Sequence, residues 1–472
     1  MSVIAEPPLT ALVPASLLFG GERRMEARSY LSDGYGIGQR IAALPATARF
    51  GQLADVWQPP RLKGYAVPEG KGTPFLSAGQ AFELRPRARK WLSEATVPHY
   101  NRRLVEAGWL LLSCSGQVGR VTAVYPHHAG KVMTHDLLRL VPENASDYGW
   151  LYAYMRTPQF LSVARAAQYG AMIKHLDPGH VNALPVPLPP PSVRRRVGQL
   201  AERAVGARRE ASALLDRADR LYEALINPAG VALPSRDWGP VPARRLFEGR
   251  RRLDGQHWAP RVKAVEALLA GAATHGVDTV AGVTRRVELG NRFKRSFGPK
   301  GTPYYSASDL FDVNASATKR VYAGLLKDAS PYYLRAGWIV MACSGQAYGL
   351  LGRSLVLGEQ HEGVFGSHDL IRIEPDPVSI RTGYLQTVLS NETYGRLLVV
   401  RHAFGTTVPH LDPVDIRAVP VPRFSRDREA EVADSSEQAF AKSAEADRLE
   451  NLATRQAAEA IQALLGEKPG AN

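Results

Sequence analysis

The chain has 472 residues, with 59 Lys and Arg against 45 Asp and Glu, which gives a formal net charge of +14 and a sequence pI near 9.8. This excess of positive charge favours a polyanionic partner, of which nucleic acid is the commonest. A hydrophobic content of 45% is enough for two or more domains with their own cores. The sequence contains no run of ~18 apolar residues that could span a bilayer and no secretory signal, so we expect a cytoplasmic protein.

The two halves of the sequence repeat each other. The offset between matching motifs grows only from 228 residues (Val13 to Val241) to 235 residues (His175 to His410), so few gaps separate the copies. A repeat of this length can form a domain by itself, unlike the units of roughly 20 to 50 residues in solenoid proteins. Two similar domains in one chain offer two similar binding surfaces to one ligand. The repeated motifs are Val13-Pro14-Ala15 with Val241-Pro242-Ala243, Gly72-Thr73-Pro74 with Gly301-Thr302-Pro303, Cys114-Ser115-Gly116-Gln117 with Cys343-Ser344-Gly345-Gln346, His135-Asp136-Leu137 with His368-Asp369-Leu370, and His175-Leu176-Asp177-Pro178 with His410-Leu411-Asp412-Pro413.

The first part of each copy is rich in Gly, Pro, Trp and Tyr, which predicts strands and loops with few helices. Trp109 to Leu112 and Trp338 to Met341 are short apolar runs that end at a Ser-Gly turn, as is typical of buried strands. We therefore predict an α+β fold with one globular domain at 1–190 and a second at 228–424.

Two long helices are predicted, at 191–227 after the first domain and at 425–466 after the second, followed by a short tail at 467–472. Ser192 to Ile226 contains no proline, and its apolar residues recur in steps of four and three, which is a heptad seam that requires a partner helix. We expect the second helix, whose stripe is rich in alanine, to be that partner in an antiparallel coiled coil. Packing of each helix only on its own domain is the alternative. The residues expected to pair the helices or to dock partners are Val197, Leu200, Leu214, Leu221, Leu225, Val432, Leu449 and Leu464.

Motifs for catalysis and for metal binding are missing from the sequence. Ser330-Pro331-Tyr332-Tyr333 lacks the second proline of the loop with which adenine methyltransferases hold a flipped base, so we interpret it as a turn. No Walker loop occurs either. Cys114 and Cys343 are the only cysteines and occupy equivalent places, which fits small buried side chains better than a disulfide or a metal site. We therefore predict a chain without a catalytic or metal site.

Two pairs of repeated histidines allow more than one interpretation. His135 and His368 each precede an aspartate where an apolar run begins, which favours a structural hydrogen bond at a strand start over a catalytic role. His175 and His410 each follow a Gly-containing stretch and precede a Leu-Asp-Pro helix start. Contact with a phosphate and a role in loop structure are equally compatible with that position.

The ordered set of repeated motifs resembles the specificity subunits of type I restriction-modification enzymes. The resemblance covers nearly the whole chain and rests on the duplicated order of the motifs, since no single motif is diagnostic. It implies two target recognition domains that each read one half of a split DNA sequence, and two helices that set the gap between the halves. The segments that carry the resemblance are Cys114-Ser115-Gly116-Gln117-Val118-Gly119-Arg120, Gln168-Tyr169-Gly170-Ala171-Met172-Ile173-Lys174-His175-Leu176 and Leu184-Pro185-Val186-Pro187, each with its counterpart in the second copy.

The resemblance also implies partners and cofactors. The chain would be a non-catalytic subunit that binds double-stranded DNA and docks two adenine-N6 methyltransferase (M) subunits, which use S-adenosylmethionine. Where restriction (R) subunits exist, two of them would join the complex and use ATP and Mg. No cofactor would bind in this chain itself. The alternatives are a specificity subunit of another phage-defence or DNA methylation system and a stand-alone duplicated DNA-binding or scaffold protein.

Residues that read bases are expected where the two copies differ, because shared residues maintain the fold. The segments before each Gly-Trp pair differ and are basic. Arg can read guanine, and Gln or Asn can read adenine, through bidentate hydrogen bonds. Because these segments differ, we predict two unequal half-sites. The candidate DNA-binding residues are Arg61, Lys63, Lys71, Gln80, Arg87, Lys90, Gln117, Arg120, Lys174 and His175 in the first copy, and Arg286, Asn291, Arg292, Lys294, Arg295, Lys300, Gln346, Arg353 and His410 in the second.

Overall fold

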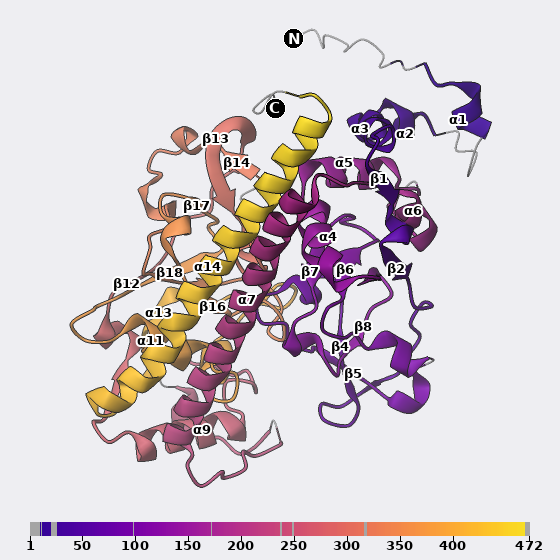
Figure 1. The fold of residues 1–472 in the computed structure, drawn as a ribbon. Coiled ribbons are helices and arrows are strands. Elements are labelled where there is room, and N and C mark those ends of the chain that lie inside the picture. Colours follow the sequence, from indigo (N-terminus) through magenta and orange to yellow (C-terminus); the bar gives the residue numbers. More distant parts are fainter. Residues whose placement is uncertain are drawn as a thin grey trace. The chain divides into compact units, whose positions relative to one another are not determined.

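A computed structural model of the chain describes residues 10, 12–19, 26–97, 99–170, 172–236, 238–247, 250–315 and 319–467. Ala171 of the motif set and residues 468–472 of the predicted tail lie outside this part. The chain divides into two compact units, which we call unit 1 (Met1–Gly206 with Ala446–Asn472) and unit 2 (Ala207–Glu445). Each unit thus contains part of both long helices (Figure 1). Among the described residues, no helix combines the length and apolar character needed to cross a membrane.

A four-stranded antiparallel sheet in the order β2-β9-β6-β7 forms the core of unit 1. Three residues of the predicted apolar run, Leu110 to Leu112, are buried in β6, whereas Trp109 precedes the strand and is half-buried. Helix α4 packs into the same core and buries seven of its eight residues, which explains why its sequence is apolar on every side. These elements are β2 (Ala54–Trp57), β6 (Leu110–Ser113), β7 (Val121–Ala123), β9 (Leu137–Pro142), α4 (Tyr148–Met155) and α5 (Pro158–Ala166).

Smaller elements complete unit 1. A second sheet in the order β3-β5-β4-β8 has its own small apolar cluster around Leu92, Val97 and Val132. The short strands β1 and β10 pair just before the first long helix, and β10 is the Pro-Val-Pro motif. The bounds are α1 (Ala15–Phe19), α2 (Ala27–Leu31), α3 (Asp33–Ala42), β1 (Thr47–Arg49), β3 (Ala66–Val67), β4 (Thr73–Leu76), β5 (Lys90–Leu92), β8 (Val132–Met133), α6 (Pro178–Ala183) and β10 (Pro185–Pro187).

Unit 2 repeats this plan with longer strands in its first half. Its main sheet has the order β12-β18-β15-β16 and its smaller sheet the order β14-β13-β17. The bounds are α8 (Ala243–Leu246), α9 (Pro260–Ala272), β11 (Val277–Thr279), β12 (Thr284–Leu289), β13 (Phe297–Tyr305), α10 (Ala307–Leu310), β14 (Lys319–Val321), β15 (Ile339–Ala342), β16 (Ser354–Val356), β17 (Phe365–Gly366), β18 (Leu370–Pro375), α11 (Thr382–Ser390), α12 (Gly395–Val400), α13 (Pro413–Arg417) and β19 (Pro420–Pro422).

The strand register makes the two main sheets comparable residue by residue. In unit 1, Trp57 of β2 lies opposite Arg139 of β9, and in unit 2, Glu288 of β12 lies opposite Arg372 of β18. Arg139 and Arg372 follow the repeated His-Asp-Leu motif at the same distance. Trp57 and Glu288 are therefore equivalent positions, although the two residues themselves differ in chemistry.

The two long helices have the predicted extent. Helix α7 covers Pro191–Ile226 and helix α14 covers Arg426–Leu464. Three of the residues predicted for the seam, Val197, Val432 and Leu449, are buried. The other five are only half-buried, namely Leu200, Leu214, Leu221, Leu225 and Leu464.

Each unit buries residues from both long helices in its own core. In unit 1, Val197 and Ala201 of α7 share a core with Ala453, Ala457 and Ile461 of α14. The core of unit 2 in turn contains residues from the second half of α7 and the first half of α14, namely Ala218, Tyr222, Ile226, Val432 and Ala433. The buried stripe therefore includes Tyr222 and Ile226, which the heptad seam omits, because α7 also packs on the globular part of unit 2.

Candidate nucleic-acid interface

Three repeated motifs of unit 1 meet at Cys114. The backbone N–H of Cys114 donates to the carbonyl of Asp136 at 3.0 Å, and the carbonyl of Cys114 accepts from the N–H of Leu176 at 2.9 Å. The Ser-Gly turn continues this contact, since the N–H of Gly116 donates to Lys174 O at 3.2 Å. The Cys114 thiol itself is buried, and burial raises its pKa to about 12, so it is not a reactive thiolate.

Unit 2 makes the same contacts in the same order. The N–H of Cys343 donates to Asp369 O at 3.0 Å, and Cys343 O accepts from the N–H of Leu411 at 2.8 Å. Gly345 N–H donates to Pro409 O at 3.1 Å, which replaces the Lys174 carbonyl of unit 1. These contacts use only backbone atoms, so the side chains around them are free to differ between the units.

A short loop closed by a histidine projects from this junction in each unit, and we call its described residues the bridged loop (169–170 and 172–175 in unit 1, 404–410 in unit 2). Tyr169 and His175 exchange two backbone hydrogen bonds of 2.9 Å, and Phe404 and His410 exchange two of 3.0 and 2.7 Å. The residue after the aromatic one is Gly170 or Gly405, each with a φ of +95°, which side chains of other residues rarely allow. The backbone of His175 and of His410 thus closes its loop, which leaves phosphate contact by the side chain as a prediction.

The register aligns two pairs of basic residues that sequence comparison left unaligned. Arg61 and Lys63 stand four and six residues after Trp57, and Arg292 and Lys294 stand four and six residues after Glu288. All four side chains are exposed. We call these two Arg-x-Lys pairs the basic strips.

A buried polar side chain holds the backbone just before each strip. The carbonyl of Pro60 accepts from Arg103 Nη2 at 2.8 Å, and the carbonyl of the equivalent Asn291 accepts from the Tyr332 hydroxyl at 2.7 Å. Arg103 and Tyr332 occupy matching places in the two copies, 229 residues apart. The strips are therefore anchored at the same point by different chemistry.

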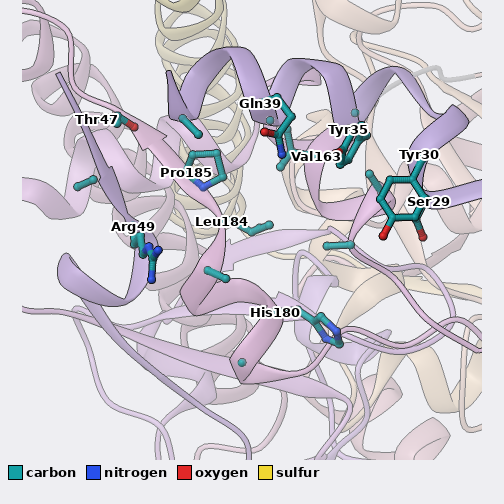
Figure 2. Close-up of a pocket in the computed structure, with 18 of the residues that line it drawn as sticks. Ser29, Tyr30, Tyr35, Gln39, Thr47, Arg49, Val163, His180, Leu184 and Pro185 are labelled. Atoms are coloured by element: carbon teal, nitrogen blue, oxygen red, sulfur yellow. The ribbon is translucent and has the colours of Figure 1, made fainter. Parts of the chain in front are cut away.

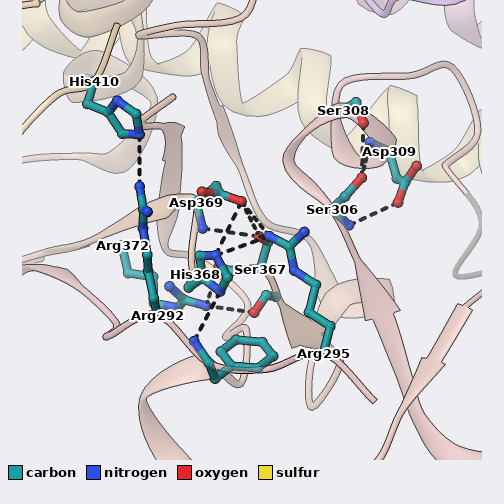
Figure 3. A network of polar contacts seen from close by, with 12 residues as sticks. Arg292, Arg295, Ser306, Ser308, Asp309, Ser367, His368, Asp369, Arg372 and His410 are labelled. Atoms are coloured by element: carbon teal, nitrogen blue, oxygen red, sulfur yellow. Dashed lines mark hydrogen bonds and ion pairs between the residues drawn. The ribbon is translucent and has the colours of Figure 1, made fainter. Parts of the chain in front are cut away.

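In unit 2 the basic strip contacts the bridged loop directly (Figure 3). Arg292 Nη2 lies 3.2 Å from His410 Nε2, while His410 Nδ1 lies 2.6 Å from the carbonyl of Val408. Since a carbonyl can only accept, Nδ1 carries the proton and Nε2 accepts from the arginine. This contact fixes both the ring and the guanidinium.

Arg295, one residue beyond the strip, bonds to the repeated His-Asp motif (Figure 3). Its Nη2 lies 2.6 Å from Asp369 Oδ2 and 3.2 Å from the Ser367 hydroxyl. Partial burial alone raises the pKa of Asp369, but the hydrogen bond from Ser367 and the positive charge of Arg295 lower it below its usual value. Burial also lowers the pKa of His368.

The His-Asp motif of unit 1 is also held by structural contacts. The Thr134 hydroxyl donates to Asp136 Oδ2 at 2.9 Å, and His135 Nε2 lies 3.5 Å from Asp136 Oδ1. Gln58 Nε2 donates to the carbonyl of His135 at 2.7 Å. These contacts fit the structural interpretation of the motif.

Each unit contains a buried arginine, Arg139 or Arg372, that was not among the residues predicted from the sequence. The guanidinium of Arg139 donates to the carbonyls of Thr134, Leu137 and Met133. The guanidinium of Arg372 donates to four carbonyls at 2.8 to 3.3 Å, those of Leu370, Tyr332, Gly366 and Ser367. Burial lowers their pKa to about 9 and about 10, so both stay charged at neutral pH. The sequence could have identified both arginines, because the repeated motif reads His-Asp-Leu-apolar-Arg in both copies.

The structure corrects the assignment of Gln80 as a base reader. Its side chain is only 4% exposed, its Oε1 accepts from the Ser77 N–H at 3.1 Å, and its Nε2 donates to Arg87 O. Gln80 therefore closes a turn inside unit 1. Arg103, a basic residue of the same segment, is equally buried and holds Pro60.

The remaining candidates differ in their contacts and in their exposure. Arg120 stacks on Phe82 at 4.1 Å, and Lys174 Nζ donates to Gly170 O, so both side chains are restricted. Gln346 Nε2 approaches the Thr407 carbonyl of the bridged loop at 3.5 Å, and Arg286 pairs with Glu374 at 3.3 Å. Arg61, Lys63, Lys71, Lys90, Gln117, Arg286, Asn291, Arg292, Lys294, Arg295, Lys300 and Gln346 are exposed, whereas Arg87, Arg120, Lys174, His175, Arg353 and His410 are half-buried.

A separate pocket of about 630 Å³ lies in unit 1 among α3, α5, α6 and β1 (Figure 2). Tyr30, Tyr35, Gln39, Arg49 and His180 line it together with small apolar residues. Burial raises the pKa of Tyr35. No group of three or more His, Cys, Asp or Glu able to hold a metal ion occurs in the described part of the chain.

No protein-family model matches the chain, and no curated protein matches its sequence. Among solved structures, the chain is similar to the crystal structure of the type I restriction-modification system S subunit from M. genitalium, at 13% identity over 89% of this chain and 96% of that one, with a TM-score of 0.37. It is also similar to the HsdS subunit from Thermoanaerobacter tengcongensis (13% identity, 90% and 98% covered, TM-score 0.26). A third match belongs to a study of complex assembly and conformational transition of the type I R-M system (14% identity, 89% and 97% covered, TM-score 0.27). The solved structures that this chain resembles thus include S subunits of type I systems, the class that its sequence motifs also resemble.

Proposed function

We propose that this chain is the non-catalytic DNA-reading subunit of a type I restriction-modification complex, and that it reads a bipartite, asymmetric target with one half-site for each unit. One observation carries the proposal. Both units place an exposed Arg-x-Lys strip at the same position after the edge strand of the main sheet, in a chain with a net charge of +14. Two equivalent cationic surfaces in one polypeptide suit a long polyanion that presents two sites.

The shared and the differing residues have different roles in this proposal. Phosphate contacts position a protein on DNA without reading sequence, and base contacts specify the sequence. The strips Arg61 with Lys63 and Arg292 with Lys294 are common to both units, so we assign them to phosphates. The side chains that differ between the two bridged loops are then left to read bases, which makes the half-sites unequal.

The long helices have a spacing and docking role in the proposal. We infer that the two globular parts are tandem target recognition domains and that α7 and α14 pair as an antiparallel coiled coil between them. Support comes from the heptad seam, from the α7 and α14 residues buried in a shared core within each unit, and from the ion pair of Lys442 with Glu210 at 3.0 Å in unit 2. In unit 1, Leu200 of α7 and Leu452 of α14 line a common hollow of about 590 Å³. Two methyltransferase subunits, and restriction subunits where they exist, would dock on these helices and bring S-adenosylmethionine, ATP and Mg.

The spacing role has a direct test. The seam from Val193 to Leu225 would make a rod of about 48 Å at ~1.5 Å per residue. Insertion of one heptad into both helices adds about 10 Å, so we expect the gap of the target to grow by about 3 base pairs at ~3.4 Å each. An unchanged gap would refute the ruler.

The whole proposal is tested by co-expression of the chain with the adenine methyltransferase subunit of its system in a host without DNA methylation. Long-read sequencing then maps N6-methyladenine across the genome. We expect a split motif with a fixed gap and unequal halves that disappears when this chain is omitted. Methylation without a split motif, or methylation independent of this chain, would reject the proposal and leave a stand-alone DNA-binding protein as the better account.

A further inference from the structure

The two bridged loops share their base and differ at their tip. Each begins with an aromatic residue and a glycine of φ +95°, and each ends at a histidine that exchanges two backbone hydrogen bonds with the aromatic residue. Between these ends the sequence has Ala171-Met172-Ile173-Lys174 in unit 1 and Thr406-Thr407-Val408-Pro409 in unit 2. A base that both units share, with a tip that differs between them, is the arrangement expected of an element that is held in place to make a different contact in each unit.

The tips are unusually open to solvent for apolar residues. The side chain of Met172 is 98% exposed and that of Ile173 is 59% exposed, while Val408 in unit 2 is 47% exposed. Packing inside the unit therefore does not explain the choice of Met and Ile. The backbone hydrogen bonds at the base of the loop, together with the Gly116 bond to Lys174 O, instead keep the tip projecting.

Each unit carries an exposed basic strip, and in unit 2 the strip contacts the bridged loop, which argues for DNA as the occupant. Arg292 contacts His410 at 3.2 Å, and Lys294 and Arg295 follow in sequence. In unit 1 the equivalent strip carries Arg61 and Lys63, and Lys174 belongs to the loop itself. A unit that combines an exposed loop tip with an exposed basic strip suits a duplex, whose phosphates lie beside groove surfaces that include thymine methyl groups.

We propose that the tip of each bridged loop enters a groove of its own half-site and reads bases there. In unit 1, Met172 and Ile173 read by apolar contact with thymine methyl groups or an opened base step; in unit 2, the hydroxyls of Thr406 and Thr407 read by hydrogen bonds. This inference rests on the proposed function and adds the residues that separate the two half-sites. The loop thus determines which DNA sequence is bound, whereas the basic strips supply affinity that does not depend on the DNA sequence.

The test combines matched variants of both tips with the methylation map. The unit 1 variant is M172A with I173A, the unit 2 variant is T406V with T407V, which removes hydroxyls but keeps the shape, and the control is V378A, an apolar side chain that is 86% exposed elsewhere in unit 2. We expect the unit 1 variant to lower methylation of the wild-type motif about tenfold and to relax only one half of it. The unit 2 variant should relax only the other half, and the control should match wild type.

Binding at several salt concentrations completes the test. The tips carry no phosphate contact in this proposal, so the slope of log K against log[salt] should stay unchanged in both tip variants. Wild-type methylation maps and affinities in the tip variants would overturn the inference. So would loss of methyltransferase co-purification with DNA affinity intact, because the tips would then bind protein. A wild-type map without any split motif would instead reject the proposed function itself.

Discussion

The two units solve the same structural problem with different side chains. Both hold three motifs together at a buried cysteine by backbone hydrogen bonds of nearly equal length. In unit 2 the cations of the site are engaged, since Arg292 bonds to His410 and Arg295 to Asp369. Within the described residues, no hydrogen bond or ion pair holds Arg61 or Lys63 in unit 1.

This difference shows that the side chains of a duplicated fold can change while its backbone contacts are kept. The contacts that set the backbone are made by N–H and C=O groups, which every residue supplies, so they survive substitution of the side chains. Side chains that point outward can then be held in advance in one unit and left free in the other. Ordering a free side chain on binding costs about 0.5 to 1.5 kcal/mol, so unit 2 should reach its half-site at a lower entropic cost.

The largest effect is expected from removal of the buried arginines. R372M leaves several buried carbonyls without a donor, and each such group costs about 1 to 3 kcal/mol, so we expect a loss of at least about 3 kcal/mol in the stability of unit 2. R139M should do the same to unit 1, and hydrogen exchange followed by mass spectrometry can report the units separately. The exposed Lys327 provides the control K327M. Unequal losses would break the equivalence of the two sheets.

Two buried histidines should make both units sensitive to acid. His128 and His361 accept a backbone N–H through Nδ1 at 3.1 Å, and burial lowers the pKa of each from 6.5 to about 4. The unfolded chain binds a proton below pH 6.5 and the folded chain only below about pH 4, so stability falls as the pH drops through this window. At pH 5 each histidine should cost about 2 kcal/mol relative to pH 7.

Urea unfolding at pH 7 and at pH 5 measures this effect. H128N and H361N should each remove about 2 kcal/mol of the stability loss between pH 7 and pH 5, although both lower the stability at pH 7. Replacement of the exposed His275 by asparagine is the control and should leave the pH dependence intact. A wild-type pH dependence in both buried variants would show that other groups dominate.

The basic strips should contribute equally to DNA affinity if they bind phosphates. We expect R61A and R292A each to weaken binding about three- to tenfold for every sequence and to lower the salt slope by about 0.9. Titrations of the complete methyltransferase complex with target and with random duplex measure both quantities. A loss confined to the target duplex would instead assign that arginine to base reading, and a difference between the units would show the value of holding Arg292 in advance.

The smallest effect is expected at the two helix starts that follow the bridged loops. The Asp177 carboxylate accepts from His180 N–H at 2.9 Å at the start of α6, and the Asp412 carboxylate accepts from Val414 N–H at 2.9 Å at the start of α13. Loss of such an N-cap costs about 0.5 to 1 kcal/mol at a partly exposed site. D177A and D412A should show this loss in thermal unfolding, while D177N and D412N, whose amide oxygen still accepts, should show little.

Local sequence patterns predicted the elements that depend on neighbouring residues. The apolar run that follows Trp338 forms β15, and the proline-free stretch from Ser192 forms most of α7. The two Leu-Asp-Pro motifs start α6 and α13, with their aspartates as N-caps. Each of these follows from burial, helix propensity or capping within a short window. The periodicity of α7 also identified Val197 as buried.

Features that depend on contacts between residues far apart in the sequence could not be predicted from it. The equivalence of Arg61 and Arg292 appears only in the strand register, because the residues opposite each other on paired strands are not neighbours in sequence. Gln80 looked like a polar surface residue, and only the fold shows that its amide is used by Ser77 and Arg87. The seam on α7 missed Tyr222 because a heptad pattern describes one partner, whereas the helix also packs on the core of unit 2.

Unit 1 is built from two separate segments of the chain, and this has a consequence for how the protein folds during synthesis. Its core needs Ala453, Ala457 and Ile461, which leave the ribosome only after residues 207–445 of unit 2 have been synthesised. At about 5 to 20 residues per second, this interval lasts roughly 10 to 50 seconds. Unit 2, by contrast, is continuous in sequence. The second half of the newborn chain can therefore finish folding first, and the earliest residues must wait for the last ones with part of their apolar surface uncovered.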